Sequence, residues 1–275
     1  MWDDLDRPPL REESLRHGLV APNGPFAALD VVTETGSTNH DLKRAAAAGA
    51  ADRTVLVAEH QSAGRGRGSR SWQAPPRSGL FVSVLLRPAG VPSRRWGWLS
   101  LIAGVALASA VTEVAGLDAR LKWPNDLLLG PLRRKAAGIL AEVTGGSALV
   151  VGIGLNVTLR AEELPVPEAT SLVLEGARNT DRDTLLRAVL RELATAEEQW
   201  RAAGGDAQAG GLAQRYRELC ATVGQVVRVE LPSGGPVFGT AVDVDGDGRL
   251  VVRDDDGVEH AVSAGDVVHV RPATS

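Results

Sequence analysis

The chain has 275 residues, and its 30 basic and 34 acidic side chains give a formal net charge of −4. This balance argues against nucleic-acid binding by the whole surface, and the length suffices for one large domain and a small one. The single cysteine excludes an intramolecular disulfide and, together with an acidic start that lacks an apolar run, favours a cytoplasmic protein. The five histidines show no metal-ligand spacing, so no metal site built from side chains alone is expected.

The first two thirds of the chain predict a sheet with helices. Residues 1–25 combine four prolines with many charges, which is typical of an irregular or partly ordered tail. Thr38 followed by Asp41 resembles a capping box and predicts a helix start. The uncharged stretch from Trp96 to Thr112 has 17 residues, too few for a membrane span, and indicates a buried helix. The expected elements are a strand at 29–33, a helix after Thr38, strands at 54–59 and 80–86, a helix near 94–115, and strands at 119–122, 127–129, 138–143 and 148–155.

The last third changes in character after residue 222. Helical periodicity covers 181–201 and 206–220, and a Gly204-Gly205 break divides the two segments. Short strands separated by glycine and aspartate turns follow and indicate a small SH3-like β-barrel. We therefore expect an α+β fold with a tail at 1–25, a mixed-sheet domain with helices at 26–220 and the barrel at 221–275. The five barrel strands are expected at 226–231, 239–243, 249–253, 259–263 and 267–270.

The segment from Gly64 to Trp72 alternates arginines with glycines and is the most distinctive part of the sequence. Glycine frees the backbone, and each guanidinium presents a rigid fork of donors suited to phosphate or carboxylate. A solvated arginine-rich hairpin would have the same composition. Two further cationic sites, Lys122-Trp123-Pro124-Asn125-Asp126 and Lys135 just before Gly138, favour a loop that binds a polyphosphate.

The order of these motifs resembles that of the biotin protein ligases from about residue 29 to the C-terminus. The motifs are Ser37-Thr38-Asn39, Gln61 to Trp72, Lys122 to Asp126, Lys135 with Gly138-Ile139-Leu140, and Gly152-Ile153-Gly154-Leu155-Asn156-Val157. The resemblance implies that ATP and Mg²⁺ are the cofactors and that biotin is converted to biotinyl-5′-adenylate. Biotin is then transferred to one lysine of a biotin carboxyl carrier protein domain of an acyl-CoA carboxylase.

The chemistry of that reaction explains the residue types. A carboxylate attacks the α-phosphorus of ATP, so two anions must be brought together by positioned cations. No enzyme nucleophile is needed, and none is evident in the sequence. The loop would admit both substrates and then close over an anhydride that water can hydrolyse.

The resemblance also assigns roles to individual residues. Ser37, Thr38, Asn39 and Gln61 would meet the ureido ring of biotin, although the first three would also suit a helix cap. Arg70 and Trp72 would lie nearer the nucleotide. The full set expected to bind biotin or nucleotide is Ser37, Thr38, Asn39, Gln61, Gly64, Arg65, Gly66, Arg67, Arg70, Trp72, Lys122, Asn125, Lys135, Gly138 and Asn156.

Four charged residues are expected to be catalytic by resemblance. Arg67 would retain the adenylate, Lys135 would hold the biotin carboxylate, and Lys122 would be a neighbour of phosphate or metal. Asp126 would orient or deprotonate the acceptor lysine, whose usual pKa of about 10.4 leaves little free amine at neutral pH. Without the resemblance, Lys135 would pass for an exposed turn lysine.

Two other patterns have simpler explanations. Gly152-x-Gly154 resembles a dinucleotide turn, but Val157 takes the third glycine position. Asp243 to Gly248 nearly satisfies a calcium-loop pattern, but its flanks are β-like, so a hairpin turn is expected.

Alternative functions remain at this stage. A lipoate ligase would share the fold, and the arginine loop and barrel favour biotin over it. A binding module that holds nucleic acid with the loop is the alternative from another class. Only about 25 residues precede the mixed-sheet domain, so no DNA-binding winged helix is expected; a monomer or weak homodimer without membrane contact is expected.

Overall fold

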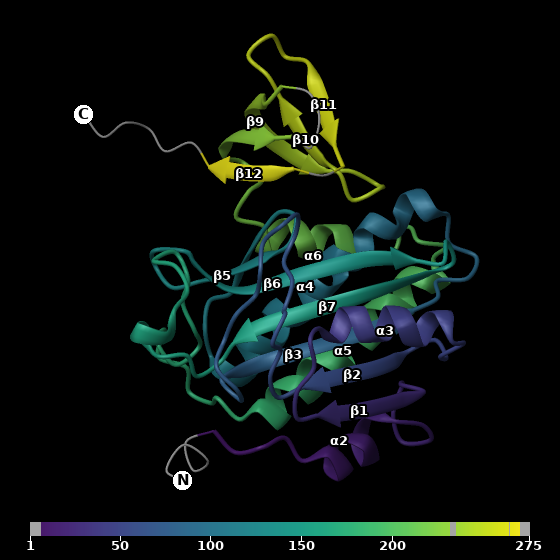
Figure 1. Ribbon diagram of the computed structural model, residues 1–275. Coiled ribbons are helices and arrows are strands. Elements are labelled where there is room, and N and C mark those ends of the chain that lie inside the picture. Colours follow the sequence, from purple (N-terminus) through teal and green to yellow (C-terminus); the bar gives the residue numbers. More distant parts are fainter. Residues whose placement is uncertain (1–6, 232–234, 264, 270–275) are drawn as a thin grey trace.

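The protein is described here by a computed structural model that covers residues 7–231, 235–263 and 265–269. A seven-stranded mixed sheet forms its body, with strand order β1-β2-β3-β7-β6-β5-β4 (Figure 1). β1 and β2 pair in parallel, and the other neighbouring strands pair antiparallel. The strands are β1 (Ala28–Val32), β2 (Thr54–Ala58), β3 (Gly79–Leu86), β4 (Arg120–Lys122), β5 (Asp126–Leu129), β6 (Arg134–Thr144) and β7 (Ala148–Asn156).

Helices cover both faces of the sheet. α4 (Trp98–Ala110) and α5 (Arg182–Ala202) lie behind it, and α3 (Thr38–Ala47) lies in front (Figure 1). Every residue of β3 is therefore buried, which explains why this strand is a nearly continuous apolar run. Leu85 of β3 packs with Leu42 of α3, whereas Val84 joins the main core on the other side.

The apolar helix expected near 94–115 is confirmed as a core element. A 3₁₀ turn (Ser93–Gly97) leads into α4, and a π-helical turn (Val111–Ala115) follows it. The whole stretch is long and apolar enough to cross a membrane by composition, but 72% of its most apolar window is buried inside the protein. Packing against the sheet accounts for this hydropathy.

The described part of the N-terminal segment is ordered, so of the two expectations, an irregular or a partly ordered tail, the first is wrong. Residues Glu12–Leu19 form helix α2, which packs on β1 and α5. Leu15 and Leu19, one helical turn apart, are fully buried. The prolines lie before and after this helix and therefore frame it. Residues 1–6 lie outside the described part of the chain.

The C-terminal domain is a five-stranded antiparallel sheet with strand order β11-β10-β9-β8-β12. Within the described residues its edge strands β11 and β12 are not paired, so the SH3-like barrel is not closed by hydrogen bonds. It is preceded by α6 (Leu212–Leu219), which starts later than expected because Gly211 adopts a left-handed conformation with φ 71°. The strands are β8 (Val226–Glu230), β9 (Val237–Val244), β10 (Leu250–Arg253), β11 (Glu259–Val262) and β12 (Asp266–His269).

The aspartate-rich segment between β9 and β10 is a hairpin turn, as expected. Asp245 Oδ1 accepts hydrogen bonds from the backbone N–H groups of Asp247 and Arg249 at 2.9 and 3.0 Å. The described residues contain no group of three or more metal-ligating side chains. The carboxylate of Asp245 therefore shapes the turn.

This hairpin turn docks the C-terminal domain onto the mixed-sheet domain. Trp98 Nε1 donates to the carbonyl of Gly246 at 3.1 Å, and Trp123 Nε1 donates to that of Gly248 at 3.2 Å. Both tryptophans are buried. A β-carbon on Gly97 would lie 2.8 Å from the Asp247 carbonyl oxygen, so the two backbones are in close contact.

We predict that the Trp98→Phe variant loses about 0.5–1.5 kcal/mol of unfolding free energy beyond a matched control, because the part-buried hydrogen bond to the Gly246 carbonyl is lost. The control is Trp200→Phe, since Trp200 is equally buried and its Nε1 has no partner among the described residues. Urea unfolding of both variants measures the difference. Equal losses in the two variants would contradict a docking role for the Trp98 hydrogen bond.

Candidate active site

A cavity of about 650 Å³ opens on the face of the sheet that carries α3. Its floor consists of β6 and β7, and the arginine loop covers it. Trp72 of the loop lies over Gly154, where a β-carbon would come within 2.7 Å of the indole ring. The close approach of Trp72 therefore requires glycine at this position, which explains the Gly152-x-Gly154 pattern.

Most of the predicted binding residues line this one cavity. Ser37, Thr38, Asn39 and Gln61 lie at one end, and Lys135, Asp126 and Asn156 lie toward the other. The remaining predicted residues that line it are Arg65, Gly66, Arg67, Arg70, Trp72, Asn125 and Gly138.

The polar end is built around the first turn of α3. The Ser37 side chain caps the helix by accepting from His40 N, and the backbone N–H of Thr38 donates to Gln61 Oε1 at 2.9 Å. Thr38 Oγ1 lies 3.1 Å from the same Gln61 oxygen. The segment is thus both a helix cap and a cavity wall.

Ser83 belongs to this polar end, although the sequence motifs did not identify it. Its hydroxyl is fully buried and lies 2.7 Å from Thr38 Oγ1 and 2.6 Å from Asn39 Oδ1. The available signal was a single polar side chain within the otherwise apolar strand β3. Ser83 orients two residues that line the cavity.

Glu142 on β6 is a second residue that the motifs did not identify. Asn39 Nδ2 donates to Glu142 Oε2 at 2.9 Å, and Lys43 Nζ lies 3.0 Å from Oε1. Burial alone would raise the pKa of Glu142, but the hydrogen bonds from Asn39 and Lys43 hold it below its usual value. An ionised Glu142 therefore fixes the amide of Asn39.

The cationic end brings together two residues with separate predicted roles. Lys135 Nζ lies 2.6 Å from Asp126 Oδ1 and 5.8 Å from the centre of the Trp72 ring. The backbone of Lys135 also holds residues 168–170, which adjoin the cavity. Its N–H donates to the carbonyl of Glu168, and its carbonyl accepts from Thr170 N, both at 2.8 Å. Trp72 Nε1 is buried without a hydrogen-bond partner among the described residues, so it can donate to a ligand.

The arginine loop folds back on itself over the cavity. Gly66 N donates to the Arg70 carbonyl at 2.7 Å, and Trp72 N donates to the Gly64 carbonyl at 2.8 Å. Gly64 does not line the cavity, in contrast to expectation. A β-carbon on Gly64 would lie 2.4 Å from the Trp72 carbonyl oxygen, so this glycine allows the base of the loop to close.

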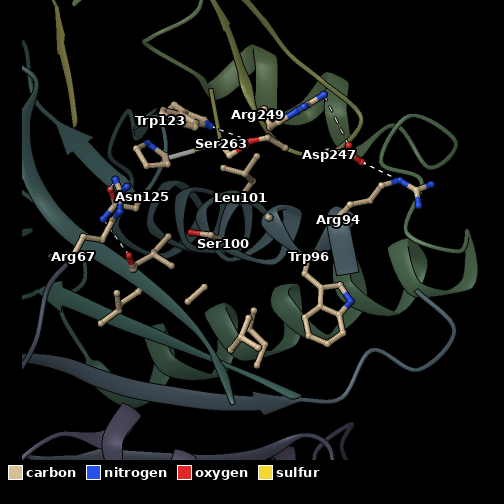
Figure 2. Close-up of a pocket in the computed structure, with 18 of the residues that line it drawn as sticks. Arg67, Arg94, Trp96, Ser100, Leu101, Trp123, Asn125, Asp247, Arg249 and Ser263 are labelled. Carbon is tan, nitrogen blue, oxygen red and sulfur yellow. Dashed lines mark hydrogen bonds and ion pairs between the residues drawn. The ribbon is translucent and has the colours of Figure 1, made fainter. Parts of the chain in front are cut away.

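Arg67 links the loop to the rest of the site. Its Nη1 lies 3.4 Å from Asn125 Oδ1 and donates to the carbonyl of Gly265, in the C-terminal domain, at 3.1 Å. Asn125 is fixed in turn, because its side chain donates to the Ile139 carbonyl at 3.1 Å. Figure 2 shows Arg67 beside Asn125 at one end of a second cavity of about 670 Å³. Arg67 and Asn125 line both cavities and separate them.

Lys122 is the predicted catalytic residue that the structure places elsewhere. It lies on the edge strand β4, where its register partner is Asp126 of β5. Asp126 lines the cavity and Lys122 does not. Because β4 is one strand further from the cavity floor than β5, its side chains are removed from the ligand space.

Comparisons with known proteins agree with these observations. The sequence profile of the biotin/lipoate A/B protein ligase family matches residues 31–157, and that of the biotin protein ligase C-terminal domain matches residues 222–270. A biotin–[acetyl-CoA-carboxylase] ligase from Mycobacterium tuberculosis is 47% identical over 98% of both chains.

Solved structures show the same relationship. A biotin protein ligase from Aquifex aeolicus in complex with biotin and ATP has a TM-score of 0.72 and 27% identity, over 90% of this chain and 100% of that one. A biotin protein ligase from Leishmania major in complex with biotinyl-5-AMP has a TM-score of 0.60 and 25% identity, over 86% of this chain and 99% of that one.

We predict that Glu142→Gln makes the unfolding free energy less sensitive to acid. Because the pKa of Glu142 is lowered in the folded protein, its ionised form stabilises the fold above its usual pKa of about 4.3, and this contribution is lost as the pH falls through the lower folded value. Urea unfolding from pH 7 down to about pH 3 tests this. The control Glu13→Gln changes an exposed glutamate on α2 and is expected to follow the wild type; a Glu142→Gln curve parallel to wild type would refute the prediction.

Proposed function

This chain belongs to the biotin protein ligase family, and on that premise we propose that the cavity under the arginine loop binds biotin and ATP end to end. The protein joins biotin to ATP to give biotinyl-5′-adenylate and pyrophosphate, and then transfers biotin to a lysine of a carboxylase carrier domain. The cavity has a polar end and a cationic end, and Gly138, Gly152 and Gly154 of β6 and β7 form the floor between them; this division supports the assignment of the site.

The polar end has the hydrogen-bond pattern that a ureido ring requires. The hydroxyls of Thr38 and Ser83 make three contacts: Thr38 with Gln61 Oε1, Ser83 with Asn39 Oδ1, and the two hydroxyls with each other. Each contact needs one donated proton, but the two hydroxyls have only two protons between them. The cluster is therefore short of donors and favours a ligand that brings N–H groups. Biotin supplies two such groups on its ureido ring, so we place the ring here.

The cationic end then receives the biotin carboxylate. Lys135 Nζ has three donors and is already paired with Asp126 at 2.6 Å. Arg65 and Arg67 line the same cavity and add charge opposite the α-phosphate. Fixed cations that neutralise two approaching anions lower the barrier without an enzyme nucleophile.

Asp126 serves the second step in this proposal. Once Lys135 Nζ contacts the substrate, the carboxylate of Asp126 can accept a hydrogen bond or a proton from the acceptor lysine. That lysine must lose a proton before its amine attacks the mixed anhydride. Arg67 and the Trp72 indole cover the anhydride until the loop opens.

Mg²⁺ is expected to enter with the nucleotide. Asp126 is the one carboxylate among the described residues that line the cavity. Magnesium is commonly held by one or two carboxylates together with substrate phosphates, and this cavity fits that arrangement. Asp126, Asn125 and Asn156 are the side chains that would meet the ion or its waters, and the ion would screen phosphate charge.

The acceptor is assigned from the relatives. The mycobacterial relative carries acetyl-CoA carboxylase in its name, and we assign this chain the carrier domain of such a carboxylase. We further propose that it acts in the cytoplasm as a monomer or weak homodimer and does not bind DNA, since a net charge of −4 disfavours nucleic-acid binding by the whole surface.

The proposal predicts that the protein, with ATP, Mg²⁺ and biotin, labels a biotin carboxyl carrier domain on its acceptor lysine. Mass spectrometry of the carrier measures the product, and Lys135→Ala is expected to reduce the adenylation rate at least about a hundredfold while the protein stays folded. Replacing biotin with lipoate tests the alternative ligase activity. A carrier left unlabelled by the wild-type protein, beside a known ligase that labels it, would exclude the proposed function.

We also predict that Arg67→Gly releases the adenylate faster, because the loop loses its contacts with Asn125 and Gly265. The rate at which biotinyl-5′-adenylate appears free in solution, without acceptor, is expected to rise about tenfold or more. Arg44→Ala is a suitable control, since Arg44 is largely exposed on α3 and does not line the cavity. Unchanged retention in Arg67→Gly would show that Arg67 does not hold the intermediate.

A further inference from the structure

Residues Arg7–Arg11 form a strap across the end of the sheet from which the arginine loop emerges. The N–H of Leu10 donates to Glu59 Oε1 at 2.6 Å, and the carbonyl of Pro8 accepts from Arg182 Nη2 at 2.5 Å. Glu59 and Arg182 are both buried and pair with each other at 2.6 Å. A buried charge that loses a partner is energetically costly, so the contacts with Glu59 and Arg182 fix the backbone of the strap.

At the start of this strap, Arg7 reaches the segment that follows β7. Its guanidinium makes a bidentate pair with Glu163, at 3.1 Å to Oε1 and 2.5 Å to Oε2. The same guanidinium donates to the carbonyl of Thr158 at 2.8 Å. The side chain of Arg7 is only 13% exposed. One side chain thus holds both ends of the six-residue segment 158–163.

The segment held by Arg7 leads directly into a wall of the cavity. Pro165, Val166 and Ala169 line that wall, and Val166 exposes about half of its surface. The far end of the wall is fixed by the backbone hydrogen bonds between Lys135 and residues 168 and 170. Arg7 therefore anchors the near end of a wall whose other end is already secured.

This wall belongs to the nucleotide end of the cavity. It adjoins Lys135 and Asn156, at the ends of β6 and β7 opposite to Leu140 and Gly152, where Asn39 of the ureido end lies. The space between the wall and Trp72 is therefore left for the adenosine. A displaced wall would weaken nucleotide binding and leave the biotin end intact.

We propose that Arg7 is a positioning residue for ATP: through its bidentate pair with Glu163 and its hydrogen bond to Thr158, it sets the wall at 165–169 against which the nucleotide lies. The inference rests on the proposed function. Hydrogen bonding from Arg7 also holds the pKa of Glu163 below its usual range, so the pair persists at neutral pH.

The test is a kinetic comparison of Arg7→Ala with wild type, using pyrophosphate release at saturating biotin. The KM for ATP is expected to rise about tenfold, in line with the loss of a charge-assisted pair. The dissociation constant for biotin alone, measured by calorimetry, is expected to stay within about twofold. Glu163→Gln should raise the KM for ATP in the same way, and the double variant should be no worse than the more affected single variant.

Arg16→Ala is the matched control. Arg16 lies on α2 and pairs with Glu12 and Asp30, away from the cavity, so its variant is expected to keep the wild-type KM for ATP. Should Arg7→Ala fold poorly, Arg7→Lys keeps the charge but loses the bidentate geometry and should show a smaller rise in the same constant.

Two results would overturn the inference. The first is a folded Arg7→Ala protein with an unchanged KM for ATP, and the second is an equal loss of affinity for biotin and ATP, which would indicate general loosening. Failure of the proposed function is distinguishable, because the wild-type protein would then form no adenylate at all.

Discussion

The buried ion pair between Glu59 and Arg182 fixes the part of the fold that carries the arginine loop. Glu59 follows β2, at the start of the excursion to the loop, and Arg182 also reaches the carbonyl of Gly79, where β3 begins. The pair therefore fastens both strands from which the loop projects. Its desolvation is offset by the Leu10 N–H and the Pro8 carbonyl, so the N-terminal strap and the loop depend on the same charges.

The two ends of the cavity next to this ion pair differ in their chemistry. The end at Thr38 and Ser83 is short of donors and suits a ligand with N–H groups, whereas the end at Lys135 is cationic and suits anions. The C-terminal domain contributes through the carbonyl of Gly265, which accepts from Arg67. Trp123, at the centre of the Lys122 to Asp126 motif, docks that domain by its hydrogen bond to Gly248. The motif thus joins the two domains beside the cavity.

The sequence predicted the order of the strands along the chain and most of the polar and charged residues that line the cavity, because glycine, proline and arginine restrict local structure strongly. It did not predict Ser83, since one serine in an apolar strand carries no local sign of the neighbours it meets 44 residues away. Helix α2 was missed because the prolines around it dominated the composition. Lys122 was expected in the site because it belongs to the same motif as Asn125 and Asp126. The structure places it on β4, the edge strand of the sheet.

The kind of chemistry can be inferred from local sequence: an arginine–glycine loop, a capped polar turn and Lys135 just before Gly138 indicate an anionic ligand held by positioned cations. Which of these groups lie together depends on the tertiary structure. Lys135 and Asp126 meet at 2.6 Å because β5 and β6 pair, and Arg7 meets Glu163 across 156 positions of the chain. Such contacts depend on strand order and packing, which local composition does not encode.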